Sequence, residues 1–261
     1  MTPYRLALAQ LDPAPADVPA NLDKLKAAAR QAQSGGAHVL ILPELFMSGI
    51  PSPEHYEHAS LTAAELKQEL TGLAAETRLD LAVGFCERTG ADDRLYNSAL
   101  YVTGAGQVAA LYRKTHLFAD ERLLFAQGDR LFTFPTKYAR AGILICFDVE
   151  FPETARSLAL RGAQAIYVPT ANMLPYLFQQ QAYARARACE NHVFVAICNR
   201  VGRSPSHEFF GHSMVVTPLG QVLCEGGEGE EVLIADIDPN QIDQSKKAFV
   251  YLHQRRPELY G

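Results

Sequence analysis

No stretch of the 261-residue sequence stays apolar over the about 20 residues that a membrane-spanning helix needs. The N-terminus also lacks the basic segment followed by an apolar segment that marks a secretory signal peptide. The chain has no tryptophan, and its five cysteines show none of the close paired spacings that bind zinc. We therefore expect a cytoplasmic protein in a reducing compartment, with no membrane span, no metal site and no structural disulfide.

The chain also has little excess charge, and because that charge is negative it argues against nucleic acid as a partner. The net charge is −5, so we expect no basic surface for nucleic acid. A hydrophobic fraction of 48% and a charged fraction of 20% are ordinary for a soluble globular protein. Because there is no repeat, linker or low-complexity stretch, we expect one domain over residues 1–261, with residues 250–261 as an extended C-terminal tail.

Apolar runs and turn signals alternate in two ways along the chain. Short apolar strands are predicted at residues 4–11, 39–42 and 79–85. Helices are predicted to begin at Asn21 and at Thr62, where Thr-Ala-Ala-Glu forms a capping box. Turns at 104–106 and 218–220 predict hairpins, and residues 239–249 predict a short final helix. This mixture indicates an α/β protein with helices outside a mixed sheet system rather than a doubly wound sheet.

A cysteine lies at a predicted strand-to-helix turn. The strand at 142–145 ends at Cys146, and Pro152-Glu153 opens the next helix. A side chain at such a turn can project from the end of a sheet, as the serine nucleophiles of other hydrolases do. Most free cysteines are small buried hydrophobes, so the cysteine alone leaves both interpretations open.

Two more polar residues follow apolar strands in the same way. Glu44 follows Leu-Ile-Leu-Pro, and Lys114 follows Ala-Ala-Leu-Tyr-Arg. A thiol nucleophile needs a base to take its proton, and the oxyanion that it creates needs a fixed positive donor. Glu44, Lys114 and Cys146 supply one group of each kind. We interpret Asn97 as a structural hydrogen-bond partner near Glu44 or Lys114, and His116 as a support for the lysine loop.

The residues around these three positions resemble known signature motifs. The motifs are Leu-Pro-Glu-Leu-Phe at 42–46, Tyr-Arg-Lys-Thr-His at 112–116 and Cys-Phe-Asp at 146–148 followed by Pro152-Glu153. In this order they are similar to the signature motifs of the nitrilase superfamily of carbon–nitrogen hydrolases. The resemblance covers the whole chain and implies a four-layer αββα sandwich. It also implies a homodimer that pairs through the helices after the cysteine, and neither a metal nor an organic cofactor.

The same resemblance implies catalytic roles. Cys146 would be the nucleophile, Glu44 the general base, and Lys114 the support for the oxyanion together with the backbone N–H of Phe147. The family has a second glutamate after the lysine motif, and counting back from Gly-Asp at 128–129 favours Glu121. The alternative for Glu121 is a solvated surface acid in a charged segment. We also expect Lys114 to favour ionisation of the nearby thiol.

Positions at which this chain differs from other members of the superfamily indicate the substrate class. Nitrilases usually have Trp-Glu after the cysteine, whereas this chain has Phe-Asp, which favours an amide or carbamoyl substrate. Related enzymes for carboxylate-bearing substrates tend to have an arginine at the position of Glu150. Glu150 would repel a carboxylate and could meet an amine, or it could serve only as an acid at a helix N-terminus. We predict that Phe147, Glu150, Asn172 and Tyr176 contact substrate.

The sequence pattern is most similar to bacterial aliphatic amidases, including stereoselective carboxamide amidases. We therefore predict an amidase that hydrolyses a small primary carboxamide, neutral or amine-bearing, through a cysteine thioester. The alternatives are an ω-amidase or an N-carbamoyl hydrolase of the same superfamily, and less favoured a nitrilase or an acyltransferase. Apart from a second copy of the chain, the only partner that we expect is the small-molecule amide.

Overall fold

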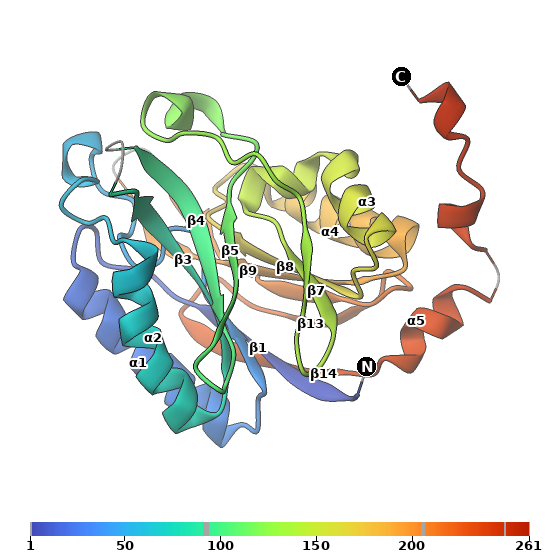
Figure 1. Cartoon of the computed structure of the whole chain (residues 1–261), viewed down its shortest axis with the longest axis horizontal. Helices are drawn as coiled ribbons and strands as arrows, with labels where there is room; N and C mark the ends of the chain where they lie inside the picture. The colour runs from blue at the N-terminus through green and yellow to red at the C-terminus, as the bar shows by residue number, and fades with distance from the viewer. Residues whose placement is uncertain (1, 91–93, 205–206, 248, 261) are drawn as a thin grey trace.

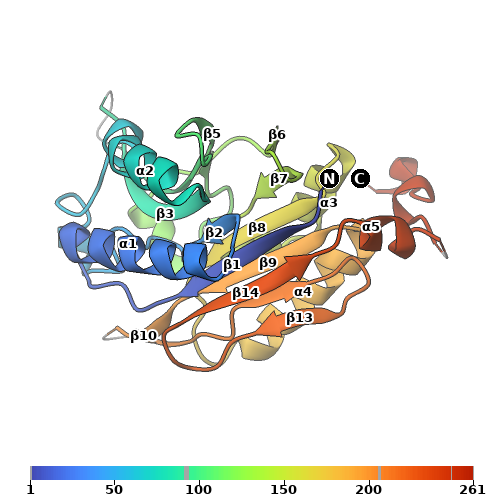
Figure 2. The ribbon, with the colours of Figure 1, turned by 90° about the horizontal axis from the view of Figure 1, so that it is seen from below.

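The computed structural model describes residues 2–90, 94–204, 207–247 and 249–260. In these residues two six-stranded sheets lie between outer helices (Figures 1 and 2). The first sheet has the order β14 (Glu231–Ile237), β1 (Tyr4–Gln10), β2 (Val39–Ile41), β3 (Asp80–Arg88), β4 (Leu95–Val102) and β5 (Val108–Arg113). The second has the order β13 (Val222–Glu225), β12 (Met214–Val216), β9 (Phe194–Asn199), β8 (Ala165–Thr170), β7 (Arg140–Ile143) and β6 (Thr133–Pro135). A small hairpin of β10 (Val201–Arg203) and β11 (Glu208–Phe210) lies beside them.

Two pairs of helices form the outer layers. Helices α1 (Val18–Ser34) and α2 (Ala63–Thr77) cover the first sheet, and α3 (Pro152–Leu160) and α4 (Leu177–Asn191) cover the second (Figure 1). The predicted capping box opens α2, because Glu65 N donates to Thr62 Oγ1 at 3.2 Å and Thr62 N donates to Glu65 Oε2 at 2.7 Å. The capping box therefore sets where α2 begins.

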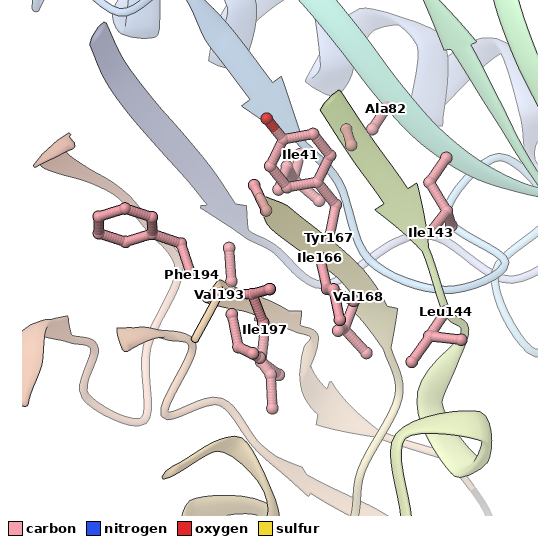
Figure 3. Packing of buried hydrophobic residues seen from close by; sticks show 14 of the residues in the cluster. Ile41, Ala82, Ile143, Leu144, Ile166, Tyr167, Val168, Val193, Phe194 and Ile197 are labelled. Atoms are coloured by element: carbon pink, nitrogen blue, oxygen red, sulfur yellow. The ribbon is translucent and has the colours of Figure 1, made fainter. Parts of the chain in front are cut away.

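Alternation along the strands divides the core. In β1, Leu6 and Leu8 belong to the core between the sheets, whereas Ala7 and Ala9 pack in the core under α1 and α2. The period of two puts successive side chains on opposite faces of a strand. The first of these cores continues through the second sheet to α3 and α4, so the successive residues Ile166, Tyr167 and Val168 of β8 in Figure 3 all belong to it, on alternating faces. Full burial of one such aliphatic side chain contributes about 1.5–3 kcal/mol to folding.

The predicted start of α1 is wrong. The helix begins at Val18, and Asp17 caps it by accepting from Ala20 N at 3.0 Å. Asn21 lies inside the helix and is buried, where its Nδ2 donates to Met47 O at 3.1 Å. Asn21 therefore ties α1 to the loop after β2 instead of capping the helix.

The C-terminal segment is also more structured than predicted. The last α-helix, α5, covers only Asn240–Ser245. The expected extended tail at 250–261 contains two 3₁₀ helices, Tyr251–His253 and Pro257–Leu259, and residue 261 lies outside the described residues. Bonds such as Leu259 N to Arg256 O at 2.8 Å form these single turns. Figure 1 shows this segment leaving the body of the molecule beyond α5.

The ends of several strands meet at one edge of the sandwich. β2 and β7 end shortly before Glu44 and Cys146, and β5 ends immediately before Lys114. Glu44 N donates to Thr170 O at the end of β8 at 3.4 Å, which links the two sheets at this edge. No helix in the described part of the chain combines the length and the apolar character that a membrane crossing requires.

Candidate active site

Lys114 lies at the centre of a buried charged cluster. Its side chain is 1% exposed, and its Nζ lies 2.7 Å from Glu44 Oε1 and 2.7 Å from Glu121 Oε2. Asn97 Nδ2 donates to the same two carboxylates, at 2.7 Å to Glu44 and 2.9 Å to Glu121. Phe118 N also donates to Glu121 Oε2 at 2.7 Å. Glu121 thus lies in the site and is not a solvated surface acid, and Asn97 has the position that we expected.

The cluster determines which of its members can exchange a proton. Burial alone would lower the pKa of Lys114, but the carboxylates of Glu44 and Glu121 outweigh burial and raise that pKa. Burial raises the pKa of Glu44 above its ordinary value, although the Lys114 ammonium acts in the opposite direction. The ammonium therefore keeps its charge. Glu44 has a higher proton affinity than an exposed glutamate, which suits a group that takes up and returns a proton.

Cys146 occupies a strained corner at the start of a 3₁₀ helix, Cys146–Glu150. Its φ of +46° lies in the left-handed region, which costs a residue with a side chain about 1–3 kcal/mol. Its Sγ donates to Asn172 Oδ1 at 3.3 Å. Burial and the Glu44 charge raise the pKa of the thiol, and the lowering by Lys114 does not offset them. The expected ionisation by Lys114 is thus opposed by burial, which favours the thiol over the thiolate.

Asp148 connects the cysteine corner to the lysine loop. It is fully buried, and its Oδ2 accepts from Ile145 N at 3.0 Å and from Tyr112 Oη at 2.8 Å. Its Oδ1 accepts from Thr115 Oγ1 at 2.7 Å and from His116 N at 2.8 Å. His116 Nδ1 lies 3.0 Å from the same oxygen, so His116 does support the lysine loop. Sequence reasoning missed this role of Asp148, although an acid within the cysteine turn was the available signal.

A cavity of about 370 Å³ opens above these groups. Its reactive side is formed by Glu44, Lys114, Asp120, Glu121 and Cys146. Its apolar side includes Leu45, Ile50, Pro51, Tyr56, Phe118, Phe125, Met173 and Phe209. The cavity is thus built to hold a small molecule with an apolar part against a charged reactive end. Within the described residues, no three His, Cys, Asp or Glu side chains are grouped so that they could hold a metal ion.

The four predicted substrate contacts lie around this cavity and not in its lining. Phe147 packs edge to face against Phe118, with ring centroids 5.3 Å apart. Asn172 contacts the cysteine sulfur. Burial raises the pKa of the Glu150 carboxyl, against the charges of Lys114 and Arg187. Tyr176 is 40% exposed just before α4. Asn172 is thus hydrogen-bonded directly to the reactive sulfur.

Comparisons with known proteins identify the family and the fold. The family model described as carbon–nitrogen hydrolase matches residues 5–247. An (R)-stereoselective amidase of a Pseudomonas species is 37% identical over 237 residues, which are 87% of this chain and 83% of the relative.

Two solved structures have the same fold. An amidase from Nesterenkonia is 32% identical, with a TM-score of 0.85 over 98% of this chain and 94% of that chain. A Saccharomyces cerevisiae member of the nitrilase superfamily is 31% identical, with a TM-score of 0.90 over 97% of each chain. The predicted αββα sandwich and the superfamily resemblance are confirmed. The chain belongs to the carbon–nitrogen hydrolase family.

Proposed function

We propose that this carbon–nitrogen hydrolase is an amidase that converts a small primary carboxamide to the carboxylic acid and ammonia. The observation that carries the proposal is the buried Lys114 ammonium held between Glu44 and Glu121 in the same cavity as Cys146. These groups supply a nucleophile, a base and a fixed cation in one water-poor site. Such a set is suited to acyl transfer through a thioester.

The proposed reaction begins with the protonated thiol. Glu44 takes the proton as Sγ of Cys146 forms a bond to the amide carbon, and the carbonyl electrons move onto oxygen. Lys114 Nζ and the backbone N–H of Phe147 stabilise that oxyanion, and loss of one such donor typically costs about 100- to 1000-fold in rate. Glu44 returns the proton to nitrogen as the C–N bond breaks and ammonia leaves. Water then gives a proton to Glu44 as its oxygen attacks the thioester carbon, and Glu44 returns that proton to Sγ as the C–S bond breaks and the acid leaves.

The lining of the cavity favours an acyl group without a carboxylate. Glu44, Asp120 and Glu121 line it, and among the described lining residues Lys114 is the one lysine or arginine. Lys114 is already paired with two of these acids. A substrate carboxylate would therefore enter a site whose charge has its own sign, at an unfavourable Coulomb energy. A neutral apolar chain would pack against the aromatic wall, and an amine would meet the acids.

A buried arginine behind the wall does not change this balance. The guanidinium of Arg200 lies 4.2 Å from the ring centroid of Phe209, on which it stacks. Its Nη2 pairs with Asp12 Oδ1 at 2.7 Å, so its charge is compensated away from the cavity. Related solved structures of the Nesterenkonia amidase, described as complexes with butyramide and with acrylamide, support a short uncharged acyl group here.

Ammonia release from a matched series of amides tests the proposal. The series is butyramide, β-alaninamide and succinamate, which place a methyl group, an amine or a carboxylate at the far end of the chain. N-carbamoyl-β-alanine and butyronitrile extend it. We expect release from the first two, abolished in Cys146→Ala. Turnover of succinamate alone would instead favour an ω-amidase. Turnover of N-carbamoyl-β-alanine alone would favour an N-carbamoyl hydrolase, and turnover of butyronitrile alone would favour a nitrilase.

Release that survives in Cys146→Ala would overturn the thioester mechanism. An absence of turnover across the series, with folded protein, would contradict the amidase proposal. Adding hydroxylamine as a second acceptor would then reveal an acyltransferase as hydroxamate product.

We also propose that the enzyme is a homodimer that pairs through α3 and α4. Leu160 at the end of α3 is 51% exposed, and Phe178 in α4 is 76% exposed. Large apolar side chains gathered on one helical layer are typical of an association surface. Sedimentation velocity should show a dimer that Phe178→Asp weakens. A monomer at all concentrations would contradict this assembly.

A further inference from the structure

A chain of amide groups leads away from the sulfur of Cys146. Sγ donates to Asn172 Oδ1 at 3.3 Å. Asn172 Nδ2 donates to Gln180 Oε1 at 3.0 Å, and Gln180 Nε2 donates to the backbone carbonyl of His212 at 2.9 Å. Gln180 lies in the first turns of α4 and is 2% exposed. The chain thus runs from the nucleophile through a buried glutamine to the backbone before β12.

The last group of the chain determines the direction of every bond. A backbone carbonyl can only accept, so Gln180 must turn its NH₂ toward His212 and its Oε1 toward Asn172. Asn172 must then turn its NH₂ toward Gln180, which leaves Oδ1 facing Sγ. An acceptor that faces the sulfur bonds to the thiol and not to the thiolate. The orientation of both side-chain amides therefore follows from the network.

The backbone of Asn172 is held separately. Asn199 Oδ1 accepts from Asn172 N at 2.8 Å, and Asn199 Nδ2 donates to Asn172 O at 3.2 Å. Asn199 is itself clamped by Ser213, whose Oγ accepts from Asn199 N at 2.9 Å. With the backbone clamped in this way, the rotation of the Asn172 side-chain amide is the movement that Gln180 restrains.

We propose that Gln180 is a positioning residue for catalysis, because through Asn172 it holds an acceptor against Cys146 and so fixes the orientation of the thiol. The inference rests on the proposed function in one respect, the role of Cys146 as nucleophile. Gln180 touches neither the sulfur nor the lining of the cavity. It keeps the S–H bond directed at Asn172 until Glu44 takes the proton, and it leaves substrate binding unchanged.

The test compares Gln180→Leu, Gln180→Glu and Gln181→Leu in the full chain. Leucine removes the acceptor for Asn172 Nδ2, so the amide can turn and present Nδ2 to sulfur. Glutamate keeps that acceptor, but when it is ionised it loses the bond to His212 and places a buried charge against that carbonyl. Gln181 is the matched control, since its Nε2 pairs with Glu225 Oε1 at 2.6 Å on the outside of the same helix.

Two readouts are measured on each variant. The first is kcat and KM for the amide that wild type turns over best. The second is the pH dependence of iodoacetamide alkylation at Cys146, resolved by peptide mass spectrometry because the chain has four other free cysteines, Cys86, Cys189, Cys198 and Cys224. We expect Gln180→Leu to lower kcat about tenfold with KM unchanged, which is the effect of one neutral hydrogen bond. We expect its alkylation midpoint to move to lower pH, because Asn172 Nδ2 then adds a donor to those that Thr170 and the Ala171 backbone already direct at the sulfur.

A general loss of packing would also expose the buried sulfur and speed its alkylation, so the Gln181→Leu control and the melting temperature of each variant separate that cause from loss of the acceptor. Gln180→Glu should retain more of kcat than Gln180→Leu, and Gln181→Leu should match wild type in both readouts. If the leucine variant does not fold, Gln180→Met makes the same test with a side chain of similar length.

An unchanged alkylation profile and kcat in Gln180→Leu, or an equal loss in Gln181→Leu, would overturn the proposal. Failure of the proposed function would look different. If ammonia release survives in Cys146→Ala, Cys146 is not the nucleophile and the proposed function fails. The alkylation profile of the Gln180 variants would still report on the orientation of the thiol.

Discussion

Two buried carboxylates in this enzyme, Glu44 and Asp148, have the same charge and opposite surroundings. Asp148 accepts hydrogen bonds from backbone and side-chain donors of two loops. Glu44 meets one ammonium and one amide, and burial raises its pKa. Saturation with donors makes Asp148 a fixed brace, because moving it would break many bonds at once. Sparse partners and a raised pKa make Glu44 the carboxylate that can take and return a proton.

The largest effect is expected from Glu44→Gln. The amide keeps the shape of the side chain but cannot take the thiol proton, so kcat/KM should fall about 100- to 10,000-fold, the usual contribution of a general base. Initial rates of ammonia release measure it. Glu69→Gln, on the exposed face of α2, is the control and should match wild type. A loss below tenfold in Glu44→Gln would assign the base to another group.

Asp148→Asn should act mainly on folding. An asparagine NH₂ would face donors such as Tyr112 Oη and Ile145 N, leaving buried polar groups without acceptors. We expect the free energy of unfolding to fall by about 2–4 kcal/mol. Urea denaturation measures the change, and the exposed Asp129→Asn provides the control. If stability is unchanged and only kcat falls, the division of roles between the two carboxylates is wrong.

The charged cluster could be predicted from sequence because chemistry limits the choice. Glu44, Lys114 and Cys146 each follow an apolar strand, and strand ends meet at one edge of a sheet. Glu121 followed from its spacing to a later turn within the family pattern. These inferences succeed where a short segment contains both the strand and the functional residue that follows it.

The rest of the site depends on loops whose paths the sequence pattern does not encode. Tyr56 reaches the cavity from a distant loop and Phe209 from the small β10–β11 hairpin, while Glu150 and Tyr176 lie close in sequence to site residues but outside its lining. Gln180 gave no signal, because a buried glutamine on a helix is recognised only when its partners are known. Asn21 suits a helix cap by type, but Asp17 caps α1 and Asn21 serves a tertiary contact.

A smaller effect is expected in the pH dependence of stability, because the pKa of Glu44 is raised. Because burial raises the pKa of Glu44 above its ordinary 4.5, the folded protein holds that proton to higher pH than the unfolded chain does. This contribution to stability is complete below the ordinary value and is lost as pH rises through the folded value. The melting temperature of wild type should therefore fall relative to Glu44→Gln as the pH rises above the ordinary value of 4.5.

The size of this pH effect follows from linkage. A tenfold increase in proton affinity on folding corresponds to about 1.4 kcal/mol. If the melting temperatures of the two proteins change in parallel with pH, burial does not raise the pKa of Glu44.

The smallest effect is expected at His116, because several other groups also donate hydrogen bonds to Asp148. His116→Phe keeps a ring to stack on Phe151, whose centroid lies 4.1 Å away, and removes the Nδ1 contacts to Asp148 and to Thr115 Oγ1. The backbone N–H of residue 116 still donates to Asp148, as do both Thr115 donors. We expect kcat to fall no more than about threefold, the lower end for one partly exposed hydrogen bond. A loss above 100-fold with a new pH dependence would make His116 a catalytic residue, and Asp148 would then orient a histidine in addition to bracing two loops.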